Sequence, residues 1–427
     1  MPADRRDLLA LLAFQPAPEI SGMAAAWLAG TAPDDGRREL HRLVDDSLLI
    51  PRRADRFALH ELTRTFALQR LLPLVPAGQR RAALRRLVTG YLASADAADR
   101  VLTPHRYRPE LEPHEGPALT FPDSAAATAW FTAEQSNLVA ICRMAAAEGW
   151  PTACWQLAYA LRGYLFLAKA WDAWIETHRV ALDAARTAGD DWGEAVTGSN
   201  LGVALVERGH LRPAQRLYRR SMGIFRRLGD TLGEANTLGH QAWVAYCLGD
   251  MTSCYALATA ALAIYRVNDA PRNTAITLRT IALAEAELGR DAEAVRHLEE
   301  ALALAVELDL PLDAAMASNG LAQVHLRRGD LHEARRTYAT ALELGRTCRS
   351  EYEQAHAYDG LATVATRLHL RRTAAEFRQR ALQRYDALNA PEAARLRETG
   401  QGLGRPNRAT ARTHGVGSRS SPSAISD

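Results

Sequence analysis

The strongest pattern in the chain is a helical spacing of apolar residues through its second half. Leu201 and Leu205 lie one helical turn apart, and a similar spacing resumes after an interruption at Gly209-His210. Apolar residues that recur every three or four positions line one face of an α-helix, and a glycine lets the chain reverse between two helices. The pattern therefore predicts two helices joined by a short turn, over 196–208 and 211–229.

Small residues recur through the same region at a fixed spacing of forty positions. Three series show the period: Ala195, Ala235, Ala275, Ala315 and Ala355; Ala214, Cys254, Ala294, Ala334 and Ala374; and Ser221, Ala261, Ala301, Ala341 and Ala381. A fourth series holds Gly209, Gly249, Gly289 and Gly329, and then His369. Antiparallel helices approach closely only where side chains are short, so each unit is expected to be one helix pair.

A single helix pair cannot bury its own apolar faces, so neighbouring pairs are expected to stack into a solenoid with a concave surface. An alanine-rich helical domain without repeats is the alternative, but it gives no reason for one spacing to recur in five successive units. Trp155 lies in the same register upstream. We therefore expect six units of this period over 155–394.

Residues 1–72 are predicted to form a separate module of three helices and a hairpin. The helices are expected through Leu8–Leu12, from Ser21 to Leu28 and from Asp34 to Leu48, and the hairpin is expected to turn near Ala54-Asp55. Three helices followed by a hairpin make a winged helix. A plain helical capping domain is the alternative.

A helical connector is expected between that module and the repeats, over 73–154. It contains a proline-rich loop at 103–122, after which Asp123 or Ser124 is expected to cap the next helix. Residues 395–427 are rich in Gly, Ser and Arg without periodic apolar positions, which predicts a disordered tail. The expected fold class is all-α, a superhelix of helix pairs preceded by a small winged-helix domain with a short β-hairpin.

Charge and composition narrow the possible functions. The net charge of the 427-residue chain is +3, and the segment from Gly400 onward accounts for it, with four arginines against Asp427. Nucleic-acid binding normally needs a concentrated basic surface, so it is disfavoured. The five cysteines form no CxxC pair and indicate neither a disulfide framework nor a zinc site. No apolar run suits a membrane span or a secretory leader, so we expect a cytoplasmic protein without membrane contact.

No arrangement of residues predicts catalysis. A P-loop needs GxxxxGK[ST], but the only lysine of the chain is Lys169, in FLAKAW. His60-Glu61 lacks the second histidine of HExxH, and no GxSxG elbow is present. A metal between His325 and His332 is a weaker alternative to two ordinary surface histidines. We expect no enzymatic activity, no cofactor and no metal.

The repeated positions resemble the tetratricopeptide repeat (TPR). Its small residues fall as do Gly202, Ala214 and Ser221, and its aromatic residue falls as does Tyr218. The usual TPR period is about 34 residues, which is shorter than the period found here. We expect a longer second helix and a longer turn to hold the extra residues, in phrases such as RLGDTLGEA at 227–235.

The N-terminal part resembles NB-ARC, or STAND, signalling ATPases of the actinobacterial antibiotic-regulatory-protein branch. The string RFALHELTRTFALQRL at 56–71 is similar to the end of the winged helix in that family, and Leu59-His60-Glu61 stands where the family has a hydrophobic-His-Asp motif. Residues 125–150 resemble the connector of the family, through Trp130, Glu134, Asn137 and Leu138. The resemblance implies a nucleotide-sensing role for His60 if a nucleotide-binding domain is supplied in trans. Without such a domain, we expect His60 to be a structural residue.

The TPR resemblance also implies that the first helix of each unit, helix A, lines the concave surface. The residues at its second, fifth, sixth, ninth and twelfth places include Asn236, His240, Trp243, Tyr246, Arg279, Thr280, Asn319, Gln323, His356 and Asp359. An aromatic anchor among hydrogen-bonding groups is typical of a binding hot spot. We expect Trp243 to anchor a protein or peptide ligand, and packing of Trp243 against a neighbouring helix is an equal alternative.

The favoured function is a non-enzymatic TPR interaction and regulatory module, the sensor part of a transcriptional or signalling regulator. One alternative is a DNA-binding regulator, with 34–48 as recognition helix and Arg52, Arg53 and Arg56 on the wing. Residues 1–72 carry ten arginines and ten acidic residues, which weakens that alternative. Another alternative is a truncated or split ATPase that needs its nucleotide-binding domain in trans.

Overall fold

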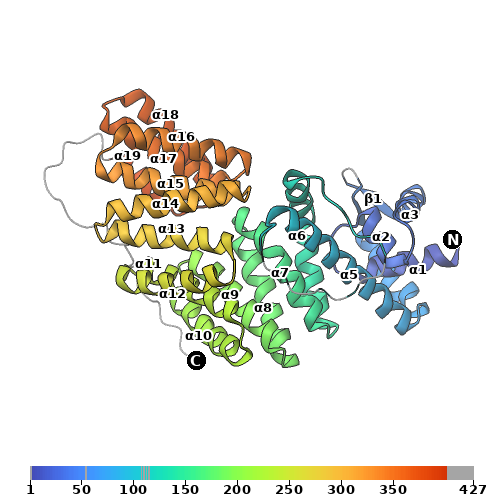
Figure 1. Cartoon of the computed structure of the whole chain (residues 1–427). Coiled ribbons are helices and arrows are strands. Elements are labelled where there is room, and N and C mark those ends of the chain that lie inside the picture. The colour runs from blue at the N-terminus through green and yellow to red at the C-terminus, as the bar shows by residue number, and fades with distance from the viewer. Residues whose placement is uncertain are drawn as a thin grey trace, which may run out of the picture.

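The computed structural model is almost entirely helical, and its helix pairs curve into a superhelix (Figure 1). It describes residues 2–52, 55–106, 108, 111, 113 and 116–401. Within these residues the strands form a single two-stranded sheet near the N-terminus. The expected all-α class with a short hairpin is confirmed.

The N-terminal module has the expected order of three helices and a hairpin. Its elements are α1 (Ala3–Phe14), α2 (Gly22–Ala29), α3 (Pro33–Asp45), β1 (Leu49–Pro51) and β2 (Phe57–Leu59). The strands are antiparallel with Leu49 opposite Leu59, and Ile20 adds a further bridge to Phe57. The third helix ends at Asp45 rather than Leu48, because the chain takes a left-handed turn at Ser47. Ala54 of the expected turn and Arg53 of the expected wing lie outside the described residues.

A buried carboxylate is among the contacts that tie the connector to this module. After α4 (Glu61–Phe66), a π-helical turn (Ala67–Leu71) and a 3-10 turn (Leu72–Leu74), it consists of α5 (Ala77–Leu102) and α6 (Ser124–Ala147). Glu134 of α6 pairs with Arg56 of the hairpin at 2.7 Å, and it accepts hydrogen bonds from Tyr91 of α5 and Asn137 of α6. A charge removed from water needs such partners. Asp123 is the cap of α6, accepting a bond from the Ala126 amide at 2.8 Å.

Six helix pairs follow, and their starts keep the period found in the sequence. They are α7 (Pro151–Leu167) with α8 (Trp171–Ala188), α9 (Asp191–Glu207) with α10 (Leu211–Leu228), α11 (Thr231–Cys247) with α12 (Met251–Val267), α13 (Pro271–Glu287) with α14 (Asp291–Glu307), α15 (Pro311–Arg328) with α16 (Leu331–Thr347), and α17 (Glu351–Arg367) with α18 (Arg371–Ala387). The alanine, cysteine and serine residues of the first three series that showed the period are all buried. The ring of Tyr218 rests against Gly202, where a Cβ atom would come within 2.4 Å of the ring.

Both turns of each unit contain one residue in the left-handed backbone region. Within pairs these residues are Lys169, Gly209, Gly249, Gly289, Gly329 and His369, and between pairs they are Gly189, Gly229, Asp269, Asp309, Arg349 and Asn389. A left-handed residue after a helix ends it by bonding its last carbonyl groups. The helices therefore keep nearly equal lengths, which keeps successive pairs in register.

Two expectations about the repeats need correction. The extra residues do not lengthen the turns, since α10 and α11 are separated only by Gly229 and Asp230. They lengthen both helices, to 17 or 18 residues each. The helical region also continues past residue 394, because α19 (Glu392–Gln401) packs its Ala393 and Leu396 against the last pair. The rest of the expected tail, 402–427, lies outside the described residues.

The turn geometry predicts opposite effects of one substitution at two glycines. Gly329 has a φ of 86° and Gly223 lies inside α10, and neither has an atom close to where a Cβ would stand. Gly329→Ala should lower the free energy of unfolding by about 1 kcal/mol, because a side chain disfavours the left-handed region. Gly223→Ala should raise it by about 1 kcal/mol through helix propensity. Urea unfolding of both variants measures this, and changes of equal sign would contradict the turn assignment.

Candidate functional site

The helix-A residues surround a common interior. Desolvation by the surrounding protein is the largest effect on the Glu207 carboxyl at the end of α9, and it raises the pKa of this group above the ordinary value. Lys169 and Arg279 of α13 oppose this rise in the pKa, whereas Glu392 of α19 and Glu353 of α17 add to it. The first and sixth units also meet directly, since the Lys169 ammonium lies 4.5 Å from the centre of the Tyr352 ring. Residues that are far apart in the chain therefore face one another across the inside of the superhelix.

Three of the predicted groove residues form one cluster. The rings of Trp243 and Tyr246 are stacked with centroids 5.1 Å apart and planes 10° from parallel. The Arg279 guanidinium of the next unit lies 5.7 Å from the Trp243 ring. All three side chains are partly exposed, so they present an aromatic surface beside a cation, an arrangement that suits aromatic and anionic groups.

Two other predicted residues are engaged in bonds within the protein. His240 bonds Ser199 at 3.0 Å and stacks on Tyr218. Burial lowers the pKa of His240 to about 3, so its ring is neutral near pH 7. Asn236 accepts hydrogen bonds from Tyr265 and Asn273 at 2.8 and 2.7 Å. These side chains hold neighbouring helices together.

The remaining predicted residues are not equally accessible. Thr280 and Asn319 are buried, and Asn319 donates to the carboxylate of Glu353 at 2.8 Å. Gln323 is exposed and His356 is half-buried, while Asp359 pairs with Arg395 of α19 at 3.1 Å. The structure thus gathers only Trp243, Tyr246 and Arg279 into a shared open surface.

Two interior cations were not predicted from the sequence. The Nε atom of Arg162 in α7 is buried without a hydrogen-bond partner among the described residues, and burial lowers the pKa of this side chain to about 10. Its charge also lowers the pKa of His240. Lys169 lies 4.1 and 5.1 Å from the Phe166 and Trp171 rings besides contacting Tyr352. A comparison between units could have found both cations. Glycine occupies the equivalent positions of the next unit, 202 and 209, so Arg162 and Lys169 depart from the repeat.

His60 lies on the surface of the N-terminal module. It is exposed, at the start of α4, with no side-chain bond to the helix. Beside it stand Leu62 and Phe66, which are 75% and 54% exposed, and further along Leu74 is 57% exposed.

Histidines and acids do not gather into a metal site in the described ranges. No three His, Cys, Asp or Glu side chains there are grouped to hold a metal ion. The ring of His332 is exposed and next to Glu333, whereas His325 lies 3.8 Å from Asp330.

Among the residues that the structure describes, no helix has the length and apolar character to cross a membrane.

The repeated helix pairs, their small contact positions and the inner helix-A surface define a TPR-type superhelix. The family model for the tetratricopeptide repeat matches residues 233–305, the segment that contains Trp243, Tyr246 and Arg279. The chain is similar to the regulatory protein AfsR of Streptomyces griseus, at 28% identity over 345 residues, covering 80% of this chain and 34% of that protein. It is 29% identical over 310 residues to AfsR of Streptomyces coelicolor, covering 70% and 30%. The chain therefore spans about a third of the length of these relatives.

Solved structures with similar helical repeats are more distant. A STAND protein with a TPR sensor from Pyrococcus horikoshii aligns over 94% of this chain and 63% of its own, with 12% identity and a TM-score of 0.43. A Rap protein complexed with competence and sporulation factor aligns over 74% and 97%, with 11% identity and a TM-score of 0.47.

The neutral interior histidines predict that acid destabilises the fold. His178 of α8 is fully buried, and burial lowers its pKa to about 3, as for His240. Below pH ~6.5 these two histidines are protonated in the unfolded chain, whereas in the folded chain they stay neutral until pH ~3. The free energy of unfolding should fall across that window, by up to ~1.4 kcal/mol per pH unit for each histidine.

Urea unfolding at pH 7, 6 and 5 measures this dependence. His178→Leu, which introduces the residue found three units later at Leu298, should make the slope shallower. His332→Ala is the control, because that ring is exposed and meets water in both states. A wild-type slope retained by His178→Leu would exclude the buried histidine as its source.

Proposed function

We propose that this chain is a non-enzymatic interaction and regulatory module that captures a protein or peptide segment on the inner surface of its superhelix. The observation that carries the proposal is the partly exposed Trp243–Tyr246 stack with Arg279 beside it. It lies in the segment matched by the TPR family model. No cofactor, metal or membrane takes part in this function.

The chemistry of the cluster favours a ligand with an aromatic or apolar group next to an acid. A flat stacked pair offers a large contact area at small conformational cost. Arg279 forms no ion pair within the part of the chain that the structure describes, so its guanidinium can donate hydrogen bonds to a carboxylate of the ligand. Trp243 also packs on the apolar cluster around Leu201 and Leu205, which fixes its orientation before a ligand arrives.

The regulatory part of the proposal rests on the similarity to the AfsR proteins. We infer that binding inside the superhelix changes the activity of a transcriptional or signalling regulator in the cytoplasm. The winged-helix interpretation of residues 1–72 belongs to the same proposal.

A peptide-display selection on the full chain tests the inner surface. One group of the peptides selected on the wild type should bind Trp243→Ala about 30-fold more weakly, a loss of about 2 kcal/mol, because a central aromatic anchor is removed. Circular dichroism of the variant should be unchanged.

The matched control is Tyr255→Ala. Tyr255 lies on α12, the second helix (helix B) of the same unit, and the Arg290 guanidinium lies 5.4 Å from the centre of its ring. Binding should survive this change. Equal losses in both variants, or loss of helicity in Trp243→Ala, would refute the inner site.

A second candidate function is docking of a nucleotide-binding domain in trans. The exposed Leu62, Phe66 and Leu74 near His60 favour it. The part of the Streptomyces griseus relative that this chain does not match, supplied as a separate chain, should bind the wild type. Phe66→Asp should abolish binding, while Val267→Asp, at another exposed apolar residue, should not. Binding that tolerates Phe66→Asp would reject this docking site.

DNA binding has less support. Arg56 of the expected wing is buried against Glu134, and on α3 Arg37, Arg38 and Arg42 each pair with an acidic side chain. These groups are already neutralised, so few cations remain for phosphate.

A further inference from the structure

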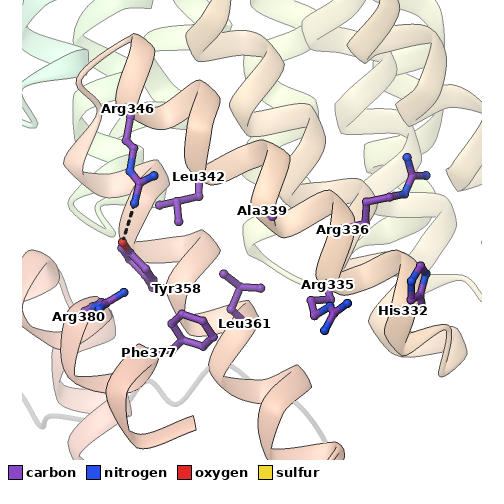
Figure 2. A pocket seen from close by; sticks show the side chains of 10 residues that line it. All are labelled: His332, Arg335, Arg336, Ala339, Leu342, Arg346, Tyr358, Leu361, Phe377 and Arg380. Atoms are coloured by element: carbon purple, nitrogen blue, oxygen red, sulfur yellow. Dashed lines mark hydrogen bonds between the residues drawn. The ribbon is translucent and has the colours of Figure 1, made fainter. Parts of the chain in front are cut away.

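The last two units carry a groove on the side opposite the inner surface. It lies between the helix-B elements α16 and α18, above α17, and has a volume of about 510 Å³ (Figure 2). Its lining comes from helices that belong to different pairs, so the groove exists only because the pairs stack.

The middle of the groove is apolar. Its lining residues there are Ala339, Leu342, Tyr358, Leu361 and Phe377. Phe377 and Ala339 are the more open of these, and the Phe377 ring lies 5.9 Å from that of Tyr358. An apolar floor of this kind accepts an aliphatic or aromatic side chain.

Both ends of the groove are basic. In Figure 2, Arg346 and Arg380 lie on one side of the apolar residues, and His332, Arg335 and Arg336 lie on the other. Arg336 is paired with Glu333 at 2.6 Å, and Arg346 with Glu343. Neither Arg335 nor Arg380 has an ion-pair partner among the described residues. The groove therefore keeps an unneutralised arginine at each end.

The groove residues of α16 follow a heptad spacing. His332, Arg335, Ala339, Leu342 and Arg346 are separated by steps of three, four, three and four along the chain. Such residues form one straight seam along a helix, the seam on which another helix packs in a coiled coil. At the rise of an α-helix, the seam from 332 to 346 is about 21 Å long.

The stacking of the helix pairs does not by itself require the basic and aromatic residues of this groove. One unit earlier, the residues equivalent to Arg335, Arg346, Phe377 and Arg380 are Val295, Val306, Thr337 and Thr340. The same helices stack there without the arginines or the aromatic ring. The groove is therefore a specific feature of the last two units.

We propose that this groove docks an acidic amphipathic helix of a partner protein, with apolar side chains in the middle and carboxylates toward both ends. The seam is about four helical turns long. A small amphiphile has one charged end and could pair with the arginines at only one end of the groove, whereas a helix can reach both. The segment of this chain after Gln401 is a poor occupant, because its four arginines carry the same charge as the groove. This docking surface is separate from the inner surface and does not depend on it.

The test uses the full chain and a random library of peptides displayed on phage, each of about 15 residues, the length at which an isolated helix begins to form in water. We expect the enriched peptides to place Glu or Asp on both sides of Leu, Phe or Trp at heptad spacing. A fluorescent copy of the best peptide should bind the wild type more weakly as salt is raised. Its binding to Arg335→Val/Arg346→Val/Arg380→Thr should be at least tenfold weaker, and Phe377→Thr should weaken it comparably.

The substitutions replace each residue by the one that occupies the same position one unit earlier, so the stacking should be retained, and thermal melts check this. Trp243→Ala should leave the affinity unchanged, which separates this groove from the inner site. Enrichment of basic or neutral peptides, no enrichment, or equal affinity for the well-folded triple variant would overturn the proposal. Labelling of the groove by a photoreactive dodecanoate without any peptide binding would also overturn it, by assigning the groove to a small amphiphile.

Discussion

The superhelix depends on one backbone constraint, a left-handed residue at each of the two turns in every repeat unit. This residue ends one helix and directs the next helix back along it. Because the turns recur at fixed positions, all helices have nearly the same length and every small contact position meets its partner. Where the position holds Asp309 or Asn389 instead of glycine, the conformation is kept by the packing of the pairs on either side.

The repeated part of the fold could be predicted from the sequence because its determinants are local. Ala334 or Ser221 marks a close helix contact wherever it stands, and the contact of Tyr218 with Gly202 follows from offsets within one unit. The length of the turns was predicted wrongly. The phrase at 227–235 contains glycines that suggest a loop, but Gly233 lies inside α11, where it makes room for the Phe225 ring.

The candidate site was predictable only in part, because accessibility depends on the angle between successive pairs. Asn319 has the offset of a groove residue, but its side-chain amide donates a hydrogen bond to the Glu353 carboxylate of the following unit. Trp243 and Arg279 could be placed on the inner side by their offsets, whereas their proximity could not. The outer groove was not predicted because its residues belong to three helices. Along any one of these helices, its arginines resemble ordinary charged residues of a solvated face. Comparing each position with its equivalents in the neighbouring units reveals them.

The contact between Lys169 and Tyr352 closes a path that runs through all six pairs. Each pair touches mainly its neighbours, so a small rotation at any interface is carried along the stack and accumulates between these two residues. The two ends of the superhelix are therefore joined by a cation–π contact as well as by the stack of helix pairs. The distance between Lys169 and Tyr352 therefore depends on the packing angle at every interface of the stack.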